Sequence, residues 1–216
     1  MKKNIFWLII IVLVLLIIFG ILHGWFRKKS SLSQEELNEI NRINSTPTPT
    51  ILPSTNPTET FSQLWFAHVS RTREFILASL HNLPDIQEKE NTLLQNQKDI
   101  ANEIDRYYHN SAPLLTDLLT EHILIAKDIV GDLKYKRLAR VPADINRWYD
   151  NGDQISEVMQ RINPNWNLKS HFRNHLALTE LEAIYEWIGL KKASLNIYNN
   201  KIVPQAQEMA NHISNF

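Results

Sequence analysis

The chain has 216 residues, of which 44% are hydrophobic and 21% are charged, and its 23 basic residues balance its 23 acidic residues. This composition is typical of a folded protein, and the neutral balance argues against nucleic acid as a partner because such binding needs a concentrated basic surface. The chain contains no cysteine and only five glycines, which excludes disulfides, thiolate metal sites, thiol nucleophiles and glycine-rich phosphate loops.

The first predicted element is a transmembrane helix over residues 5–22, which read IFWLIIIVLVLLIIFGIL without a charge. A helix of this length rises roughly 27 Å, close to the thickness of the hydrocarbon layer. Trp7 and Trp25 stand near its two ends, as interfacial aromatics do. We assign residues 1–30 to this single membrane anchor. The alternative is a cleaved signal peptide, but its apolar segment would be too long and no small-residue cleavage site follows.

Residues 31–60 are predicted to form a stalk, and residues 44–60 hold four of the nine prolines among many threonines and serines. Proline fixes φ and the hydroxyl side chains keep the segment hydrated, so we expect an extended spacer. The basic residues that flank the anchor slightly favour a cytoplasmic domain. A Pro/Thr stalk more often carries a surface domain, so we expect a single-pass membrane protein whose C-terminal domain is extracytoplasmic.

From residue 61 to residue 216 the hydrophobic residues recur with a helical period, and no segment shows the alternation typical of a strand. The more polar segment 85–108 predicts two short helices, and Pro204 is expected to kink or split the last helix. We therefore predict an all-α domain, an antiparallel four- to five-helix bundle. The long helices are expected at residues 61–82, 114–133, 137–162, 167–188 and from 191 onward.

The hydrophobic residues of each predicted helix form a stripe along one face, which we call its apolar stripe. Three of these helices each have a histidine on this stripe, and a fourth has Asn151 there. Residues near the middle of different helices meet in the core of an antiparallel bundle, so these side chains are expected to converge. Three imidazoles beside a carboxamide or a carboxylate could hold a first-row divalent metal such as zinc or iron. The predicted metal ligands are His68, His122 and His175.

Further polar side chains accompany the histidines on the same stripes. Thr72 follows His68 by four residues and Thr179 follows His175 by four, so each threonine shares a helix face with its histidine. Arg73 lies next to Thr72. These residues support a second interpretation, in which the core binds a small polar ligand. The predicted ligand-binding residues are Thr72, Arg73, Asn151 and Thr179.

Two other interpretations stay open at this point. The histidines, threonines and asparagine could form an architectural hydrogen-bond network in a surface interaction or structural module. An enzyme with a histidine as general base ranks last, because no nucleophile, acid–base pair, His-Glu-x-x-His motif or Glu-x-x-His motif is present. The sequence thus predicts a membrane-anchored bundle that binds a metal or a small polar ligand and identifies neither that ligand nor a protein partner.

Several segments between residues 64 and 183 follow one another in a specific order and spacing. They include Leu64-Trp65, His68-Val69, Thr72-Arg73, Glu121-His122, Arg147-Trp148-Tyr149, Ile162-Asn163-Pro164 and His175-Leu176. In this order and spacing the chain resembles a family of small helical-bundle proteins common in spore-forming bacteria. The resemblance implies a helical bundle with His, Thr-Arg, His, Asn and His at the positions named above, and it implies no reaction. The chain departs from the family's pattern at Arg71, where an aromatic is more usual, and at Pro204.

Overall fold

The computed structural model describes residues 56–214, and all statements about the structure concern these residues. The predicted anchor at residues 5–22 and most of the predicted stalk lie outside them. No helix of residues 56–214 combines the length and the apolar character that crossing a membrane requires. The membrane anchor and the side of the membrane on which the domain lies therefore stay predictions.

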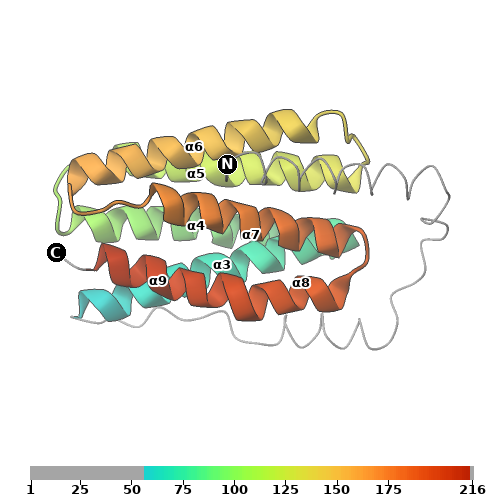
Figure 1. Ribbon diagram of the computed structural model, residues 1–216, viewed down its shortest axis with the longest axis horizontal. Helices are drawn as coiled ribbons and strands as arrows, with labels where there is room; N and C mark the ends of the chain where they lie inside the picture. The colour runs from blue at the N-terminus through green and yellow to red at the C-terminus, as the bar shows by residue number, and fades with distance from the viewer. Residues whose placement is uncertain (1–55, 215–216) are drawn as a thin grey trace, which may run out of the picture. The chain divides into compact units, whose positions relative to one another are not determined.

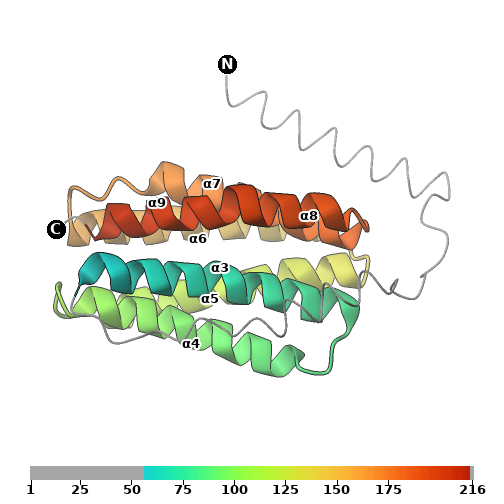
Figure 2. The same cartoon turned by 90° about the horizontal axis from the view of Figure 1, so that it is seen from below.

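Residues 56–214 are all-helical, as the apolar period predicted, and contain no strand. Successive long helices run antiparallel, and α8, η1 and α9 follow one another along the last pass of the chain (Figures 1 and 2). The fold is a helical bundle. Its elements are α3 (Pro57–His81), α4 (Ile86–Asp105), α5 (Ala112–Lys134), α6 (Val141–Ile162), α7 (Lys169–Trp187), α8 (Lys191–Ile197), the π-helix η1 (Tyr198–Ile202) and α9 (Val203–Ile213).

The structure differs from the prediction between residues 85 and 108, where a single helix, α4, replaces the two short helices expected. Leu93, Ile100 and Ile104 are fully buried on this helix. Asn96 and Gln97 are buried beside them and are hydrogen-bonded inside the bundle. These two amides interrupt the run of apolar residues on the buried face of α4. The sequence therefore suggests two short helices, although one helix packs along its whole length.

The first helix of the bundle begins four residues inside the predicted stalk. The Asn56 side chain accepts a hydrogen bond from the backbone N–H of Thr58 at 3.0 Å and caps α3. Pro57 occupies the first turn, where its missing N–H costs nothing. The helix ends at Asn82, whose φ of 57° is left-handed and turns the chain towards Pro84.

The last pass is split as Pro204 predicted. The π-helix η1 precedes α9, and Pro204 lies in the first turn of α9. A proline inside a helix removes one backbone hydrogen bond and clashes with the preceding turn, so the wider π-turn accommodates it. Gly189, with φ of 83°, follows the C-terminal end of α7, where a left-handed residue was expected.

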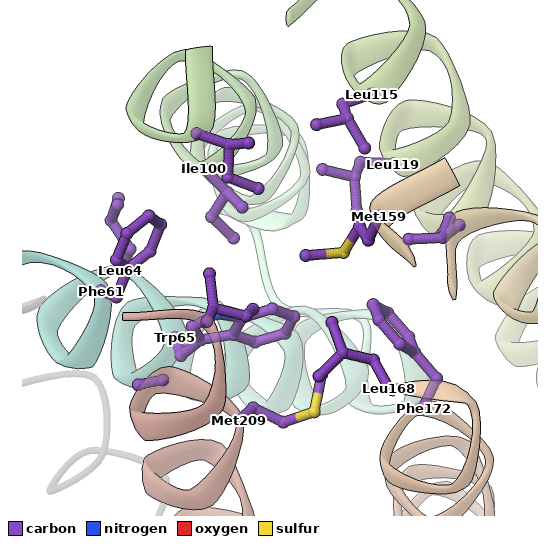
Figure 3. Close-up of a cluster of buried hydrophobic side chains, with 14 of the residues drawn as sticks. Phe61, Leu64, Trp65, Ile100, Leu115, Leu119, Met159, Leu168, Phe172 and Met209 are labelled. Carbon is purple, nitrogen blue, oxygen red and sulfur yellow. The ribbon is translucent and has the colours of Figure 1, made fainter. Parts of the chain in front are cut away.

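The hydrophobic core consists of two clusters, one in each half of the bundle. The first cluster (Figure 3) gathers residues from the beginning of α3, the end of α4, the beginning of α5, the end of α6, α7 and α9, and it includes Phe61, Trp65, Leu115, Met159 and Phe172. The second cluster takes the other half of the bundle and includes Phe75, Leu93, Ile129, Trp148 and Leu176.

We predict that Leu115→Ala lowers the free energy of unfolding by about 2–5 kcal/mol, the cost of removing a fully buried leucine and leaving a cavity. The neighbouring Leu114 is 53% exposed, so Leu114→Ala is the matched control and should change stability by less than about 0.5 kcal/mol. Urea unfolding of the full chain in a mild detergent measures both. Equal effects of the two substitutions would contradict the assignment of Leu115 to the core.

Candidate functional site

A layer of polar side chains lies between the two hydrophobic clusters. On α3, His68 falls between Trp65 of the first cluster and Phe75 of the second. His122 on α5, Asn151 on α6 and His175 on α7 occupy the corresponding places, each flanked by one cluster on either side along the chain. Each of the four is 3% exposed. The structure therefore brings the three histidines into one buried level of the bundle, which we call the polar layer.

A cavity of about 30 Å³ lies beside this level, on the side of the second hydrophobic cluster. Its size suits one or two water molecules. Five of the seven predicted site residues line it, and apolar side chains make up most of the remaining wall. The lining residues are His68, Thr72, Phe75, Ile76, Leu93, His122, Ile123, Ala126, Ile129, Val130, Trp148, His175, Thr179, Glu180 and Ala183.

The protonation of His68 is set by Gln97. The Gln97 Nε2 atom lies 3.0 Å from His68 Nδ1, and the same amide nitrogen lies 3.2 Å from the carbonyl of Leu93. An amide nitrogen can only donate, so His68 Nδ1 accepts and the proton of the neutral ring sits on Nε2. His68 therefore offers an N–H donor at its second nitrogen.

His122 has the opposite tautomer, which Asn151 sets. The Asn151 Nδ2 donates to the carbonyl of Leu118 at 3.1 Å, so its Oδ1 faces His122 Nδ1 at 2.8 Å. A carbonyl oxygen can only accept, so His122 carries its proton on Nδ1 and offers a lone pair at Nε2. Asn151 thus acts behind the cavity wall: it orients His122 rather than lining the cavity itself.

All three histidines are neutral at physiological pH. Burial, and then the neighbouring His175 and His122, hold the pKa of His68 well below its usual value. Burial lowers the pKa of His122 to about 3, although its bond with Asn151 opposes the shift. Burial lowers the pKa of His175 to about 4, opposed by the side chain of Gln205. The ring centroids of His68 and His175 are 5.4 Å apart, so a positive charge on one ring would oppose protonation of the other.

The two threonines of the constellation differ in what they already bind. Thr72 Oγ1 donates to the carbonyl of His68 at 2.8 Å, so only its lone pairs remain for a partner. Thr179 Oγ1 is buried and has no hydrogen-bond partner among the residues described. Burying a hydroxyl group without a hydrogen-bond partner destabilises the fold by about 1–3 kcal/mol, so a ligand that bonds to Thr179 Oγ1 would recover that free energy.

Glu180 is a wall residue that the sequence analysis missed. Burial raises the pKa of its carboxyl group to about 7, and a hydrogen bond from the Tyr149 hydroxyl at 3.5 Å opposes that shift. The cavity therefore has one carboxyl group that exchanges its proton near neutral pH. Glu180 and Gln97 are polar residues of types that are common on exposed helix faces, so the sequence alone does not distinguish them from surface residues.

Arg73 is placed apart from the histidines, contrary to the predicted constellation. Its Nη1 lies 2.6 Å from Glu182 Oε1 and 3.1 Å from Ser194 Oγ, and its guanidinium stacks over the ring of Tyr198. One residue along a helix is a rotation of about 100°, so Thr72 faces the cavity while Arg73 faces α7 and the last pass. Arg73 forms a buried ion pair that joins these helices.

The donor set does not favour a metal centre. Among residues 56–214, no group of three or more His, Asp or Glu side chains is placed to hold a metal ion. His68 offers a proton rather than a lone pair at its second nitrogen, and metal binding would require Gln97 to turn its amide. The first-row metal remains a prediction, and the geometry is better suited to a hydrogen-bonded ligand.

Comparison of the chain with known protein families, with curated proteins and with solved structures finds no match. The class that the fold and the site define is therefore a helical bundle with a buried polar layer and a small internal cavity. A functional assignment has to rest on the chemistry of that layer.

The depressed pKa of His122 predicts acid destabilisation. Unfolded His122 titrates near pH 6.5 and folded His122 near pH 3, so the unfolded chain binds the extra proton as the pH falls through this range. The free energy of unfolding should then fall by about 1.4 kcal/mol per pH unit from this residue alone between about pH 6 and pH 4.

His122→Gln keeps an amide donor for Asn151 but cannot titrate, so its unfolding free energy should depend less steeply on pH by that amount. The full chain and the variant are compared by urea unfolding at pH 4, 5 and 6. His109→Gln, at an exposed position, is the control and should leave the slope unchanged. A wild-type slope in His122→Gln would mean that folded His122 is already protonated or solvated.

Proposed function

We propose that this chain is a membrane-anchored helical bundle that binds a very small, uncharged polar molecule in the cavity of its polar layer. The observation that carries the proposal is the unpartnered hydroxyl of Thr179, which lies in the wall beside histidines with opposite hydrogen-bonding capacity. His68 supplies a donor, His122 supplies an acceptor, and Thr179 supplies either. A ligand that both donates and accepts hydrogen bonds would satisfy all three side chains.

Charge and size narrow the class of ligand. No lysine or arginine lines the cavity, so nothing there would neutralise an anion. The histidines are neutral, and Glu180 is only half ionised near pH 7, so a full cation would also be poorly compensated. The cavity of about 30 Å³ limits the ligand to the size of one or two water molecules unless wall side chains move.

The same geometry also supports an architectural role, which is the second candidate. His68 joins α3 to α4 through Gln97, and His122 joins α5 to α6 through Asn151. Both bonds fix the rotation of neighbouring helices without any ligand. The two candidates differ at Thr179, because a purely architectural layer has no use for an unpartnered hydroxyl.

Thr179→Val separates the two candidates. Formamide, a probe of three heavy atoms that donates and accepts, is titrated into full-length protein with ¹⁵N-labelled histidine rings. We expect saturable shifts at His68, His122 and His175 and none that saturate at exposed His109. Loss of one hydrogen bond of about 1 kcal/mol predicts that Thr179→Val binds formamide about fivefold more weakly.

The outcomes for this experiment are distinct. Thr92→Val, which removes a hydroxyl outside the cavity wall, is the matched control and should bind formamide as the wild type does. Zinc chloride is titrated in parallel: saturable binding of zinc at the three histidines would favour the metal interpretation. If formamide binding does not saturate and Thr179→Val simply raises stability, the layer is architectural.

The membrane part of the proposal is tested in cells. We expect the full chain to stay in the membrane fraction after alkaline extraction, because residues 5–22 have the length and apolarity of a membrane span. Protease added to intact cells should then remove the domain, since the Pro/Thr stalk favours an extracytoplasmic position. If the protease cleaves the domain only after the cells are opened, the domain is cytoplasmic. Release of the chain from the membrane fraction at alkaline pH would refute the predicted anchor.

A further inference from the structure

One end of the bundle carries more basic than acidic residues. The turn between α5 and α6 and the turn between α7 and α8 lie at the same end of the bundle in both views (Figures 1 and 2). These two turns and the helix ends beside them contain six basic residues, and we call this surface the basic end. Its basic residues are Lys134, Lys136, Arg137, Arg140, Lys191 and Lys192.

Acidic residues at the same end balance part of this charge, and they are Asp85, Glu88, Asp132, Asp144 and Glu186. Asp132 is buried and binds both Arg137, at 2.6 Å, and Arg140, at 3.3 Å. Asp85, in the turn between α3 and α4, lies 3.8 Å from Lys89, and Glu186 binds His81 at 2.7 Å. One carboxylate thus serves two arginines, and the exposed lysines Lys136 and Lys192 add further positive charge to the surface.

Large apolar side chains accompany the charge. Tyr135 is 63% exposed and Leu190 is 52% exposed, one in each of the two turns. Lys134 and Arg137 lie over the Tyr135 ring, at 5.4 Å and 5.1 Å from its centroid. An aromatic ring surrounded by cations, with an aliphatic side chain at the same end, suits the headgroup region of a membrane, where rings insert and cations meet phosphates.

The opposite end of the bundle has fewer basic residues. The turn between α4 and α5, residues 106–111, reads RYYHNS, and the turn between α6 and α7, residues 163–168, reads NPNWNL. With the helix ends counted as well, the basic residues of this end are Arg106, Arg161 and Lys169. Arg106 pairs with Glu103 at 2.9 Å, and Lys169 pairs with Asp153 at 2.9 Å. This end also exposes apolar groups, Tyr107 and Leu114, so the two ends differ in charge rather than in apolarity.

We propose that the basic end of the bundle docks on an anionic membrane surface. Negatively charged headgroups complement the excess cations of this end, and Tyr135 and Leu190 supply the apolar contact. The inference rests on the proposed anchor only for proximity, because a tethered domain meets the lipid surface at a high effective concentration.

The chain is long enough for this arrangement. The bundle begins with α3 at the end opposite the basic end (Figure 1), and the 25 residues of α3 rise roughly 38 Å. Between the predicted membrane span and α3 lie residues 23–56, which reach at most about 110 Å when fully extended. The tether therefore permits the basic end to reach the membrane that holds the anchor.

Single cysteines allow a direct test, because the sequence contains none. Gln87→Cys places an uncharged donor dye on the first turn of α4, at the same end as the two basic turns, and Asn165→Cys places it at the opposite end. The full chain is reconstituted into vesicles that carry an acceptor dye on their headgroups. We expect stronger energy transfer from Gln87→Cys than from Asn165→Cys in phosphatidylglycerol vesicles, and no such difference in phosphatidylcholine vesicles or in 1 M salt.

Charge variants decide whether the basic end is responsible. Lys136→Gln with Lys192→Gln should reduce the docked population relative to the undocked one about 30-fold, since each lysine near an anionic surface contributes about fivefold. Lys98→Gln with Lys201→Gln removes the same charge from exposed positions away from this end and should leave energy transfer unchanged. Equal transfer in both lipids, or equal loss in both double variants, would overturn the docking proposal.

Vesicle flotation distinguishes a failure of docking from a failure of the anchor. A chain that is anchored but does not dock floats with both kinds of vesicle and shows no difference in energy transfer between its ends, which refutes docking. A chain that docks without an anchor floats with phosphatidylglycerol vesicles only, and 1 M salt releases it. A chain that floats with neither refutes both.

Discussion

The burial of three uncharged imidazoles between two hydrophobic clusters is the constraint on which the rest of the structure depends. Burial makes the charged form of each ring unfavourable, so every histidine must satisfy its hydrogen bonds as a neutral group with one donor and one acceptor. Gln97 and Asn151, on neighbouring helices, satisfy the Nδ1 atoms of His68 and His122, respectively. Because each bond has a fixed direction, the layer sets both the rotation of the helices and the tautomers of the rings.

The cavity follows from the same constraint. The cavity lies where the polar layer meets the second hydrophobic cluster, since its apolar wall residues belong to that cluster. Directional hydrogen bonds hold the layer, so it cannot close on the cluster as tightly as two apolar surfaces would. What remains is a small space whose wall combines a donor from His68, an acceptor from His122 and the free hydroxyl of Thr179. An uncharged molecule is proposed for this site because no lysine or arginine lines it and the guanidinium of Arg73 is paired with Glu182.

The polar layer and the basic end differ in their physical environment and in how strongly salt affects them. The layer is buried and uncharged and lies between the clusters, whereas the basic end gathers cations on two turns of the bundle. Hydrogen bonds inside the core depend little on salt, and a surface of like charges depends on it strongly. Ligand binding and membrane docking would therefore respond to different conditions, and neither one requires the other.

Helical period and the distribution of polar residues on the stripes are local properties, so the sequence by itself determined the all-helical fold. It also determined that His68, His122, Asn151 and His175 would lie at one level, because each stands near the middle of its apolar stripe. Tertiary structure alone decided which partner each ring takes, because Gln97 and Asn151 reach the histidines only through the rotation and register of packed helices. The separation of Arg73 from Thr72, the pairing of Arg73 with Glu182 and the unpartnered state of Thr179 have the same cause: they depend on which neighbouring helix each face meets.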